Sequence, residues 1–256
     1  MYRLMVSKTP PLLLARELVV QYPTASAPAL NGLSLEIGRG EIFGLLGPNG
    51  AGKTTAISVM TTLLRPSSGS LLLDGEDMLT RPMQARRKIG LVPQDIALYP
   101  SLTARENIHY FGRLHGLTGK RLRARCEECL QLVGLGESAD RPIATYSGGM
   151  KRRANLAVGI VHQPQLLFLD EPTVGIDAQS RNMILENLQR LNEEGMSMLY
   201  TTHYMEEAQQ LCSRIVIIDA GHVLAEGAPS TLVAARTGCK NLEELFLQLT
   251  GRQLRD

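Results

Sequence analysis

Gly47-Pro-Asn-Gly-Ala-Gly-Lys-Thr54 decides the fold of this chain, and it matches the phosphate-loop pattern in full. Its glycines let successive backbone N–H groups turn towards one anion, and a following helix adds the positive end of its dipole. The context agrees, because a strand is predicted over 41–46 and a helix over 54–64. A glycine-rich turn by chance is the alternative, but the full pattern between a strand and a helix favours phosphate binding.

The residue types in this loop indicate what each one contacts. The ammonium of Lys53 should reach the β- and γ-phosphates of a nucleotide, and the hydroxyl of Thr54 should bind Mg²⁺. The predicted nucleotide contacts are Gly47, Pro48, Asn49, Gly50, Ala51, Gly52, Lys53, Thr54 and Thr55. The loop therefore predicts a nucleotide with Mg²⁺ as the bound group.

A second motif, Leu166-Leu-Phe-Leu-Asp-Glu171, reads as an apolar strand that ends in two acids. Because ligands of open α/β sheets bind at the carboxyl ends of the strands, both acids are expected near the phosphate loop. Asp170 should hold Mg²⁺, directly or through water, and Glu171 is the candidate general base for the attacking water. Many strands end in Asp-Glu, so this motif gains its meaning from the phosphate loop beside it.

Strand and helix patterns alternate around the two motifs. Further strands are predicted at 12–20, 33–37, 71–74, 89–92, 198–201, 215–219 and 223–225. Further helices are predicted at 177–194, 206–211 and 242–249. The last two strands form a hairpin around Gly221, and the alternation before them is typical of a largely parallel sheet covered by helices.

The stretch 95–163 changes to helices. Thr103 and Glu106 have the capping-box spacing that opens a helix. A second helix is predicted over 120–133, and Ser147 can cap a third. We interpret this block as a helical insertion in an α/β core.

Bulk composition narrows the class of protein. Of the 256 residues, 44% are apolar and 20% charged, as in ordinary soluble globular proteins. The 27 basic and 25 acidic residues leave a net charge of +2, weaker than the bias of proteins held to DNA by phosphate contacts. Four scattered cysteines fit a reducing cytosol better than a disulfide scaffold. Residues 1–8 lack signal-peptide features, and no apolar run approaches the ~20 residues that cross a bilayer, so a membrane role requires a partner.

Tyr146-Ser-Gly-Gly-Met150 makes the chain resemble one family specifically. Its serine lies 23 residues before Asp170 (170 − 147 = 23), where ABC ATPases carry their signature motif. Gln94 resembles the family's Q-loop, and Val174-Gly-Ile-Asp177 resembles its D-loop. These elements stand in the family's order beside the two nucleotide motifs.

Two single residues extend the resemblance to ABC ATPases over almost the whole chain. His203 follows the strand 198–201, like the family's switch histidine. Tyr22 lies 25 residues before Gly47 (47 − 22 = 25) and resembles the aromatic residue that stacks on adenine. A tyrosine after a strand is common, so packing is the alternative for Tyr22.

The resemblance implies a fold and a domain organisation. The fold class is α/β, a P-loop NTPase core of ABC type with an N-terminal antiparallel β subdomain and an inserted helical signature subdomain. We expect a single ABC ATPase domain over 1–256, with its nucleotide-binding core at 1–94 and 164–256 and the helical subdomain at 95–163. The expected cofactors are ATP and Mg²⁺.

The resemblance also implies roles within the site. The expected catalytic residues are Glu171, His203, Gln94 and Lys53, and the expected Mg²⁺ ligands are Thr54, Gln94 and Asp170. His203 would hydrogen-bond the γ-phosphate and help to orient the water. Gln94 would sense Mg²⁺ or water and relay this to a membrane partner.

Ser147, Gly148 and Gly149 form an anion site at a helix start that cannot easily reach the γ-phosphate held by the chain's own loop. In the family these residues complete the site of a second subunit, and Asp177 supports the opposite site. The resemblance thus implies a head-to-tail ATP sandwich, either a homodimer or a dimer with a paralogue. It also implies an integral membrane permease, with this chain peripheral at the cytoplasmic face of the cell membrane, and no nucleic acid.

Tyr146 and Met150 depart from the commonest signature, which begins with Leu and ends with Gln. The Ser-Gly-Gly between them is intact, so active sites are expected, although Met150 removes an amide near the ribose or the interface. A signature of this kind followed by Lys-Arg-Arg, together with the stretch 249–255, resembles multidrug, polysaccharide and daunorubicin-type export ATPases. Export is therefore expected, with import as the alternative because the permease sets the direction.

Two other function classes fit the sequence less well. Translation factors of this superfamily usually carry two such domains and a charged linker, and chromosome and repair ATPases carry a long coiled-coil insertion. A catalytically silent binding module would lack Lys53, Glu171 or His203, and all three are present. A transport motor is the leading hypothesis, and a non-transport ABC ATPase is the alternative.

Several polar signals are better explained without a ligand. Cys126-Glu-Glu-Cys129 has metal or redox spacing, but it lies in a predicted helix with no second pair. Arg86-Arg-Lys88 and Lys151-Arg-Arg153 are charge runs, for which solvated faces or partner contacts are favoured over nucleic acid. Surface or packing roles are expected for the isolated histidines His109, His115, His162 and His222.

Overall fold

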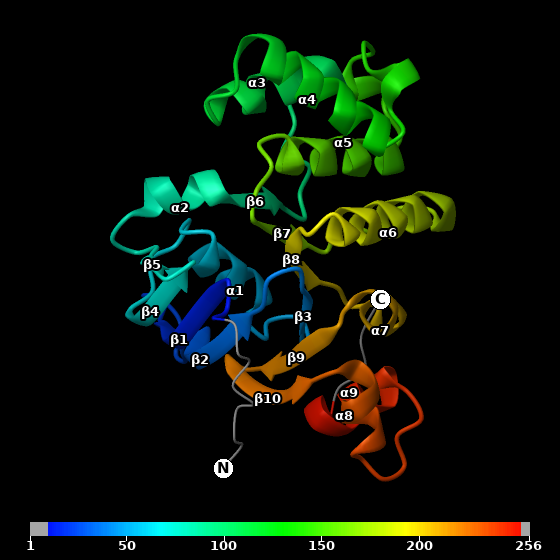
Figure 1. Cartoon of the computed structure of the whole chain (residues 1–256). Helices are drawn as coiled ribbons and strands as arrows, with labels where there is room; N and C mark the ends of the chain where they lie inside the picture. The colour runs from blue at the N-terminus through cyan, green and yellow to red at the C-terminus, as the bar shows by residue number, and fades with distance from the viewer. Residues whose placement is uncertain (1–9, 252–256) are drawn as a thin grey trace.

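A six-stranded sheet carries the phosphate-loop sequence in the computed structural model of the chain, which describes residues 10–251 (Figure 1). In spatial order its strands are β10 (His222–Gly227), β9 (Arg214–Asp219), β3 (Ile42–Leu46), β8 (Ser197–Thr201), β7 (Leu166–Asp170) and β6 (Ile89–Val92). All neighbours pair in parallel except β9 and β10, which form the predicted antiparallel hairpin. Because β3 and β7 flank β8 in parallel, the phosphate loop and the acidic motif leave the same edge of the sheet.

A second, antiparallel sheet is built from the N-terminal part of the chain. Its strands lie in the order β2 (Leu30–Ile37), β1 (Leu13–Val20), β4 (Ser68–Leu73) and β5 (Glu76–Asp77). Every pair in this sheet is antiparallel. The predicted N-terminal antiparallel part of the fold is therefore confirmed.

Side chains of the central strands alternate between two apolar cores. Phe43 and Leu45 of β3 face the core shared with the antiparallel sheet, whereas Ile42 and Leu46 face the core shared with the helices. Strands β3, β7 and β8 are buried at every position, as expected for parallel strands covered on both faces. The predicted α/β class is confirmed, with helices on one face and the second sheet together with helix α1 (Lys53–Met60) on the other.

Three helices gather at one end of the molecule, namely α3 (Ala104–Leu114), α4 (Gly119–Leu132) and α5 (Gly148–Ile160) (Figure 1). Two short 3₁₀ helices, η1 (Gly136–Ser138) and η2 (Ile143–Thr145), join α4 to α5. The capping box of α3 is present as predicted, since the Thr103 hydroxyl accepts the N–H of Glu106 at 3.1 Å. The division of the chain into subdomains at 95 and 163 stays a prediction.

Helix α5 lies unusually close to β6. A Cβ atom at Gly90 of β6 would stand 2.3 Å from the carbonyl oxygen of Gly159, and a Cβ at Gly159 would stand 2.6 Å from Val92. Any larger side chain at either glycine would push the helix off the strand. The segment that follows β6, which contains Gln94, therefore starts directly beside α5.

Some helices differ from the sequence predictions. Helix α1 (Lys53–Met60) ends before the predicted end at 64, because Thr62 adopts a left-handed φ of 60°. Two further helices, α2 (Pro82–Lys88) and α8 (Pro229–Ala234), were not predicted. Each buries a single residue, so neither shows the apolar periodicity that marks a helix in sequence.

The remaining helices lie where the sequence predicts them. They are α6 (Ala178–Glu193), α7 (Met205–Leu211) and α9 (Leu242–Thr250). Across residues 10–251, each helix is too short or too polar to cross a lipid bilayer. The segment tested for a signal peptide (1–8) and the end of the stretch 249–255 lie outside the described residues.

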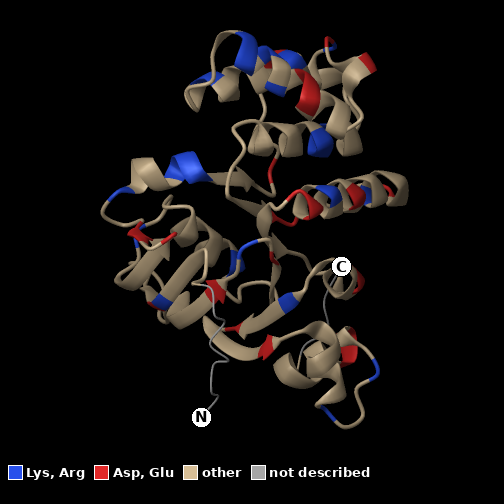
Figure 2. Ribbon diagram, in the orientation of Figure 1, with Lys and Arg blue, Asp and Glu red and all other residues tan. Residues whose placement is uncertain are grey.

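The two charge runs behave differently. Arg86-Arg-Lys88 forms the last turn of α2, which is blue in Figure 2. Both arginines are exposed. In the second run, Arg152 and Arg153 turn inward and donate to backbone carbonyl oxygens, Arg153 to that of Val133 at 2.6 Å. The expectation of a solvated or partner-facing run is wrong for these two arginines, because neighbouring segments offer carbonyl groups that the guanidinium fork can reach.

Candidate functional site

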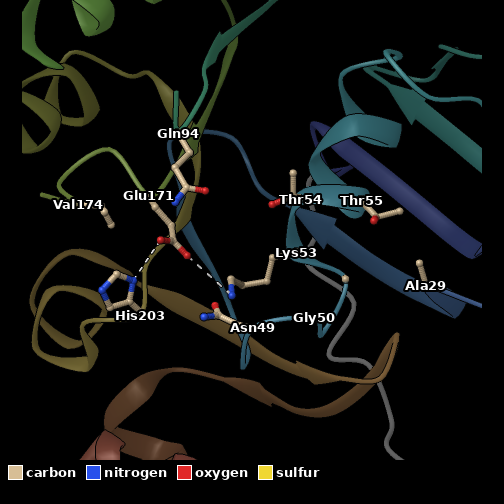
Figure 3. Close-up of a pocket in the computed structure, with 11 residues that line it drawn as sticks. Ala29, Asn49, Gly50, Lys53, Thr54, Thr55, Gln94, Glu171, Val174 and His203 are labelled. Carbon is tan, nitrogen blue, oxygen red and sulfur yellow. Dashed lines mark hydrogen bonds and ion pairs between the residues drawn. The ribbon is translucent and has the colours of Figure 1, made fainter. Parts of the chain in front are cut away.

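One cavity of about 370 Å³ opens at the carboxyl edge of the six-stranded sheet (Figure 3). Its walls are formed by Ala29, Asn49, Gly50, Gly52, Lys53, Thr54, Thr55, Gln94, Glu171, Val174 and His203. The structure thus gathers residues from the phosphate loop, the Q-loop position, the acidic motif and the switch-histidine position around one space. Val174, the first residue of the D-loop stretch, lines it as well, and so does Ala29, which carries no signal in sequence.

The phosphate loop wraps the start of α1. Gly52 stands at the N-cap with a φ of 106°, and among the described residues no side chain caps this helix. The first N–H groups of α1 therefore donate no hydrogen bond to a capping side chain, and the helix dipole adds positive potential at the same point. This arrangement suits an anion such as a phosphate group.

Lys53 is folded back over its own loop. Its Nζ donates to the carbonyl oxygens of Gly47 at 2.8 Å and Pro48 at 3.3 Å, and lies 3.8 Å from Oε1 of Glu171. Burial lowers the pKa of Lys53, and the nearby carboxylates of Glu171 and Asp170 partly oppose this. A phosphate in the cavity would give this buried ammonium a stronger partner than the carbonyl groups.

A single hydroxyl joins the two acids of the acidic motif. Thr201, fully buried at the end of β8, donates to Oδ1 of Asp170 at 2.8 Å and accepts the backbone N–H of Glu171 at 3.0 Å. Oδ2 of Asp170 accepts a hydrogen bond from the Thr54 hydroxyl at 3.3 Å. The strand end therefore fixes Asp170 between the phosphate loop and β8.

Asp170 and Thr54 have the chemistry of a Mg²⁺ site. Mg²⁺ prefers oxygen ligands and is usually bound through one or two carboxylates together with waters and phosphates. Burial raises the pKa of Asp170, while hydrogen bonds from Thr201 and Thr54 oppose the shift. A cation would compensate the desolvated charge, so a hydroxyl and a buried carboxylate 3.3 Å apart fit such an ion.

Glu171 is held between two nitrogen groups. Its Oε2 lies 3.1 Å from Nδ1 of His203, on the side away from Lys53 (Figure 3). The backbone of Glu171 has a φ of 46°, in the left-handed region that residues with a Cβ seldom adopt. Such a conformation persists only where the surroundings enforce it, and here it points the carboxylate into the cavity.

Tyr22 lies at the edge of this cavity. Its side chain is 41% exposed, and its hydroxyl is 3.4 Å from that of Thr55, which lines the cavity. An exposed ring beside the phosphate loop is free to meet a base. Stacking on adenine stays a prediction for Tyr22.

The signature and D-loop residues form a separate cluster at the starts of α5 and α6. Ser147 caps α5 by accepting the N–H of Met150 at 3.2 Å, and Asp177 caps α6 by accepting the N–H of Ser180 at 2.9 Å. A Cβ at Gly149 would stand 2.1 Å from Oγ of Ser180, so the two helix starts touch there. Neither Ser147, Gly148, Gly149 nor Asp177 is among the residues that line the cavity.

Tyr146 and Met150, the two residues that differ from the commonest signature, pack against the apolar core. Tyr146 is 5% exposed, and its hydroxyl donates to the Ser138 carbonyl at 2.5 Å. Met150 is partly buried against the same apolar core. Both residues therefore fill the helical block, and the Ser-Gly-Gly between them keeps its place at the start of α5.

The cysteine pair and three of the four histidines discounted in sequence lie inside the helical block. Cys126 and Cys129 are buried on α4, and burial raises their pKa values to about 12 and about 11, so both thiols stay protonated. His115 and His162 have a packing role, as expected, since their rings stack with centroids 3.6 Å apart. Within residues 10–251, no three His, Cys, Asp or Glu side chains are grouped to hold a metal.

Sequence reasoning missed the polar residues that position this site. Thr201 links both acids, and Arg152 bonds the backbone at Gln94 and Val174. Threonine is common at strand ends, and no local pattern reveals which way an arginine turns. The position of Thr201 two residues before His203 is the only hint that the sequence offers.

Comparison with known proteins identifies the family. Residues 30–174 match the model of the ABC transporter family. The chain is 48% identical over 221 residues to the linearmycin resistance ATP-binding protein LnrL of Bacillus subtilis, covering 86% of this chain and 70% of that protein. It is 44% identical over 210 residues to the daunorubicin resistance ATP-binding protein DrrA3 of Streptomyces coeruleorubidus, covering 82% and 66%. The predicted resemblance to daunorubicin-type ATPases is confirmed.

A solved structure agrees with this assignment. The dimeric, post-hydrolysis structure of the ATP-binding cassette MJ0796 with ADP and Pi matches with a TM-score of 0.78 and 28% identity, over 84% of this chain and 98% of that one. The fold, the cavity and the relatives therefore lead to one conclusion. The chain belongs to the ABC transporter family, and it is an ATP-binding, ATP-hydrolysing subunit of the transport type.

Proposed function

We propose that this ATPase is the motor of an export system, in which ATP-driven closure of two ATPase subunits moves a separate transmembrane permease. Two relatives support the outward direction, because both are named for resistance, to linearmycin and to daunorubicin. The observation that carries the motor role is the single cavity in which Lys53, Glu171 and His203 meet. No cargo contact is assigned to this chain, because cargo recognition belongs to the permease.

Hydrolysis would proceed by positioning and proton transfer around the γ-phosphate. Lys53 and the N–H groups at the start of α1 bind the phosphates, and Glu171 accepts a proton from the attacking water. His203, 3.1 Å from Glu171, hydrogen-bonds the γ-phosphate and helps to orient that water. Gln94 closes the cavity on the side of β6.

Thr54, Asp170 and Gln94 would hold the Mg²⁺. When bound, the ion neutralises charge that develops on the phosphate oxygens. The Thr54 hydroxyl and the Asp170 carboxylate already face each other at 3.3 Å, which supports this assignment. The nucleotide itself would contact residues 47–55 and stack its base on Tyr22.

A second subunit would complete each site. Ser147, Gly148, Gly149 and Asp177 lie together at the starts of α5 and α6, outside the chain's own cavity. Two copies arranged head to tail would bring each cluster to the other copy's ATP. The dimeric MJ0796 structure supports pairing of two subunits for a protein of the same fold. The helical block at 95–163 would act as the subdomain that carries the signature.

The permease would dock on the helical block, and the chain would lie at the cytoplasmic face of the membrane. Tyr99 and Tyr110 form an edge-to-face pair, with ring centroids 5.0 Å apart. They are 44% and 42% exposed, and the neighbouring Leu114 is 66% exposed. Exposed aromatic and apolar side chains gathered on one face mark a protein-binding surface.

Affinity capture of the tagged chain from detergent-solubilised cells, with and without ATP, tests this function. A polytopic membrane protein is the expected partner, and a ribosome or DNA complex would instead establish the non-transport alternative. Tyr110→Ala should weaken capture about 30-fold if Tyr110 contributes the ~2 kcal/mol of an interface anchor. Leu224→Ala on the distant strand β10, where the residue is 39% exposed, is the matched control and should leave capture unchanged.

A further inference from the structure

Arg152 of α5 joins two segments that border the cavity. Its Nη1 donates to the carbonyl oxygen of Gln94, and its Nη2 donates to the carbonyl oxygen of Val174 at 3.1 Å. Gln94 and Val174 both line the cavity, whereas Arg152 itself does not. The guanidinium thus acts on the site through the backbone of two separate segments.

Each segment leads directly to a residue of the proposed hydrolysis step. On one side is Gln94 itself. On the other side, the N–H of Val174 donates to the carbonyl oxygen of Glu171 at 3.3 Å, which closes a turn over 171–174. Arg152 therefore binds the last residue of the turn that begins at the proposed general base. Figure 3 shows Gln94, Glu171 and Val174 along the same wall of the cavity.

A second side chain on the same face of α5 reinforces the contact. Asn155, three residues further on and 2% exposed, accepts the N–H of Ala97 and donates to the carbonyl of Pro93, both at 3.3 Å. Residues three apart on a helix face the same way. Arg152 and Asn155 therefore hold the segment 93–97 at three backbone atoms, while Gly159 seats α5 against β6.

The charge of Arg152 has no carboxylate partner among its hydrogen bonds. Both of its bonds in the described structure go to backbone carbonyls, and burial lowers its pKa while Asp95 and Glu171 raise it. A half-buried cation whose hydrogen bonds all go to two carbonyls is costly unless both bonds are made. Arg152 therefore favours one geometry, in which the two segments stand at a fixed separation.

We infer that Arg152 is a positioning residue for ATP hydrolysis, which sets Gln94 and the Glu171 turn at a fixed distance across the cavity. The inference rests on the proposed roles of Gln94 and Glu171. Arg152 also connects α5, the helix that follows the signature serine, directly to the cavity of its own subunit. This connection is additional to the site that α5 would complete in a partner. The planar fork of arginine suits this task, since a lysine ammonium cannot span two carbonyls in the same way.

The test compares Arg152→Lys, which keeps the charge, with Lys151→Met, which removes the neighbouring charge of the same run. We expect Arg152→Lys to lower kcat about 10-fold, because small misplacements of catalytic groups have large effects on turnover. Affinity for a fluorescent ATP analogue should stay within about 2-fold of wild type, since Arg152 does not line the cavity. Lys151→Met should change neither quantity by more than about 2-fold.

A double-mutant cycle separates positioning from general destabilisation. Because Arg152 also holds the Glu171 turn, Arg152→Lys in a Gln94→Ala background should still lower kcat, but by clearly less than the 10-fold of the single variant. An unchanged 10-fold loss in that background would overturn the inference, as would wild-type kcat in the single variant. A wild-type chain that hydrolyses no ATP would instead overturn the proposed function.

Hydrogen exchange provides a measurement that does not depend on turnover. In Arg152→Lys, backbone amides of 94–97 should exchange faster than in wild type, while those of β7 keep their protection. Unchanged exchange in 94–97 would contradict the inference. A uniform rise across both segments would show that Arg152 serves only the stability of the fold.

Discussion

Replacing Glu171 with glutamine tests the chemistry of the cavity most directly. Glutamine has the shape of glutamate, and its amide can place an oxygen towards Lys53 and a nitrogen towards His203. The native contacts are long enough for this, at 3.8 Å to Nζ of Lys53 and 3.1 Å to Nδ1 of His203. The change therefore removes the base while it leaves the surroundings of the side chain in place.

The expected loss of turnover follows from the role of Glu171 as the general base. General-base catalysis contributes about 10²- to 10⁴-fold, so turnover of Glu171→Gln should fall by about 10²-fold or more. Binding should persist, because the phosphates are held by Lys53 and the start of α1 rather than by Glu171. The variant should then accumulate as an ATP-bound dimer, since closure no longer leads to hydrolysis.

Phosphate release at saturating ATP and Mg²⁺ measures turnover, and titration with a fluorescent ATP analogue measures binding. Size-exclusion chromatography with and without ATP measures dimer formation. Turnover within about 3-fold of wild type, together with normal binding, would refute the assignment of Glu171 as the base. Loss of binding would show instead that Glu171 shapes the phosphate site through Lys53.

Three further predictions concern the support of this site. Thr201→Val should lower the free energy of unfolding by about 1–3 kcal/mol, because it leaves the N–H of Glu171 and an oxygen of Asp170 without their buried partner. Denaturant titration measures this, and a change below about 0.5 kcal/mol would contradict it. Gly159→Ala should destabilise the chain by about 1–3 kcal/mol, because its Cβ would lie 2.6 Å from Val92, whereas Gly136→Ala meets open space and should be near neutral. Asp170→Asn should raise the melting temperature at pH 7 while abolishing Mg²⁺-dependent turnover. The sign follows because a raised pKa means that the native state disfavours the ionised carboxylate, so the gain should vanish as the pH falls below the ordinary value of 3.8. Melting scans from pH 3 to pH 8 check this, and a lower melting temperature at pH 7 would show that the hydrogen bonds to Asp170 outweigh its burial.

Local patterns in the sequence predicted most of the fold that carries the site. The phosphate loop, the acidic strand end and His203 are each readable within a few residues. They meet because strands β3, β7 and β8 are parallel and adjacent, so that their carboxyl ends share one edge. The rule that ligands bind at that edge is enough to group Lys53, Asp170 and Glu171 from the sequence.

The polar supports of the site could not be predicted in this way. Thr201 acts on residues about thirty positions earlier, and Arg152 reaches Gln94 from 58 residues away. Thr201 meets Asp170 through the register of β7 and β8, and Arg152 meets Gln94 because α5 packs against β6. Neither arrangement is encoded locally in the sequence. The sequence interpretation of Arg152 as part of a solvated or partner-facing run was wrong for the same reason. A charged residue on a helix is more often solvated, and the sequence does not show which neighbouring carbonyl groups it can reach.

The contact between Gly149 and Ser180 links two sequence positions that lie 31 residues apart (180 − 149 = 31). The space that any side chain at position 149 would need is already filled by the hydroxyl of Ser180. Mutational tolerance at the two positions is therefore coupled, and Gly149→Ala should be rescued by Ser180→Gly. The rescue would be incomplete, because Ser180 also donates its hydroxyl to Asp177 at 2.8 Å. In a deep mutational scan, position 149 should therefore accept a larger residue only where position 180 carries a smaller one.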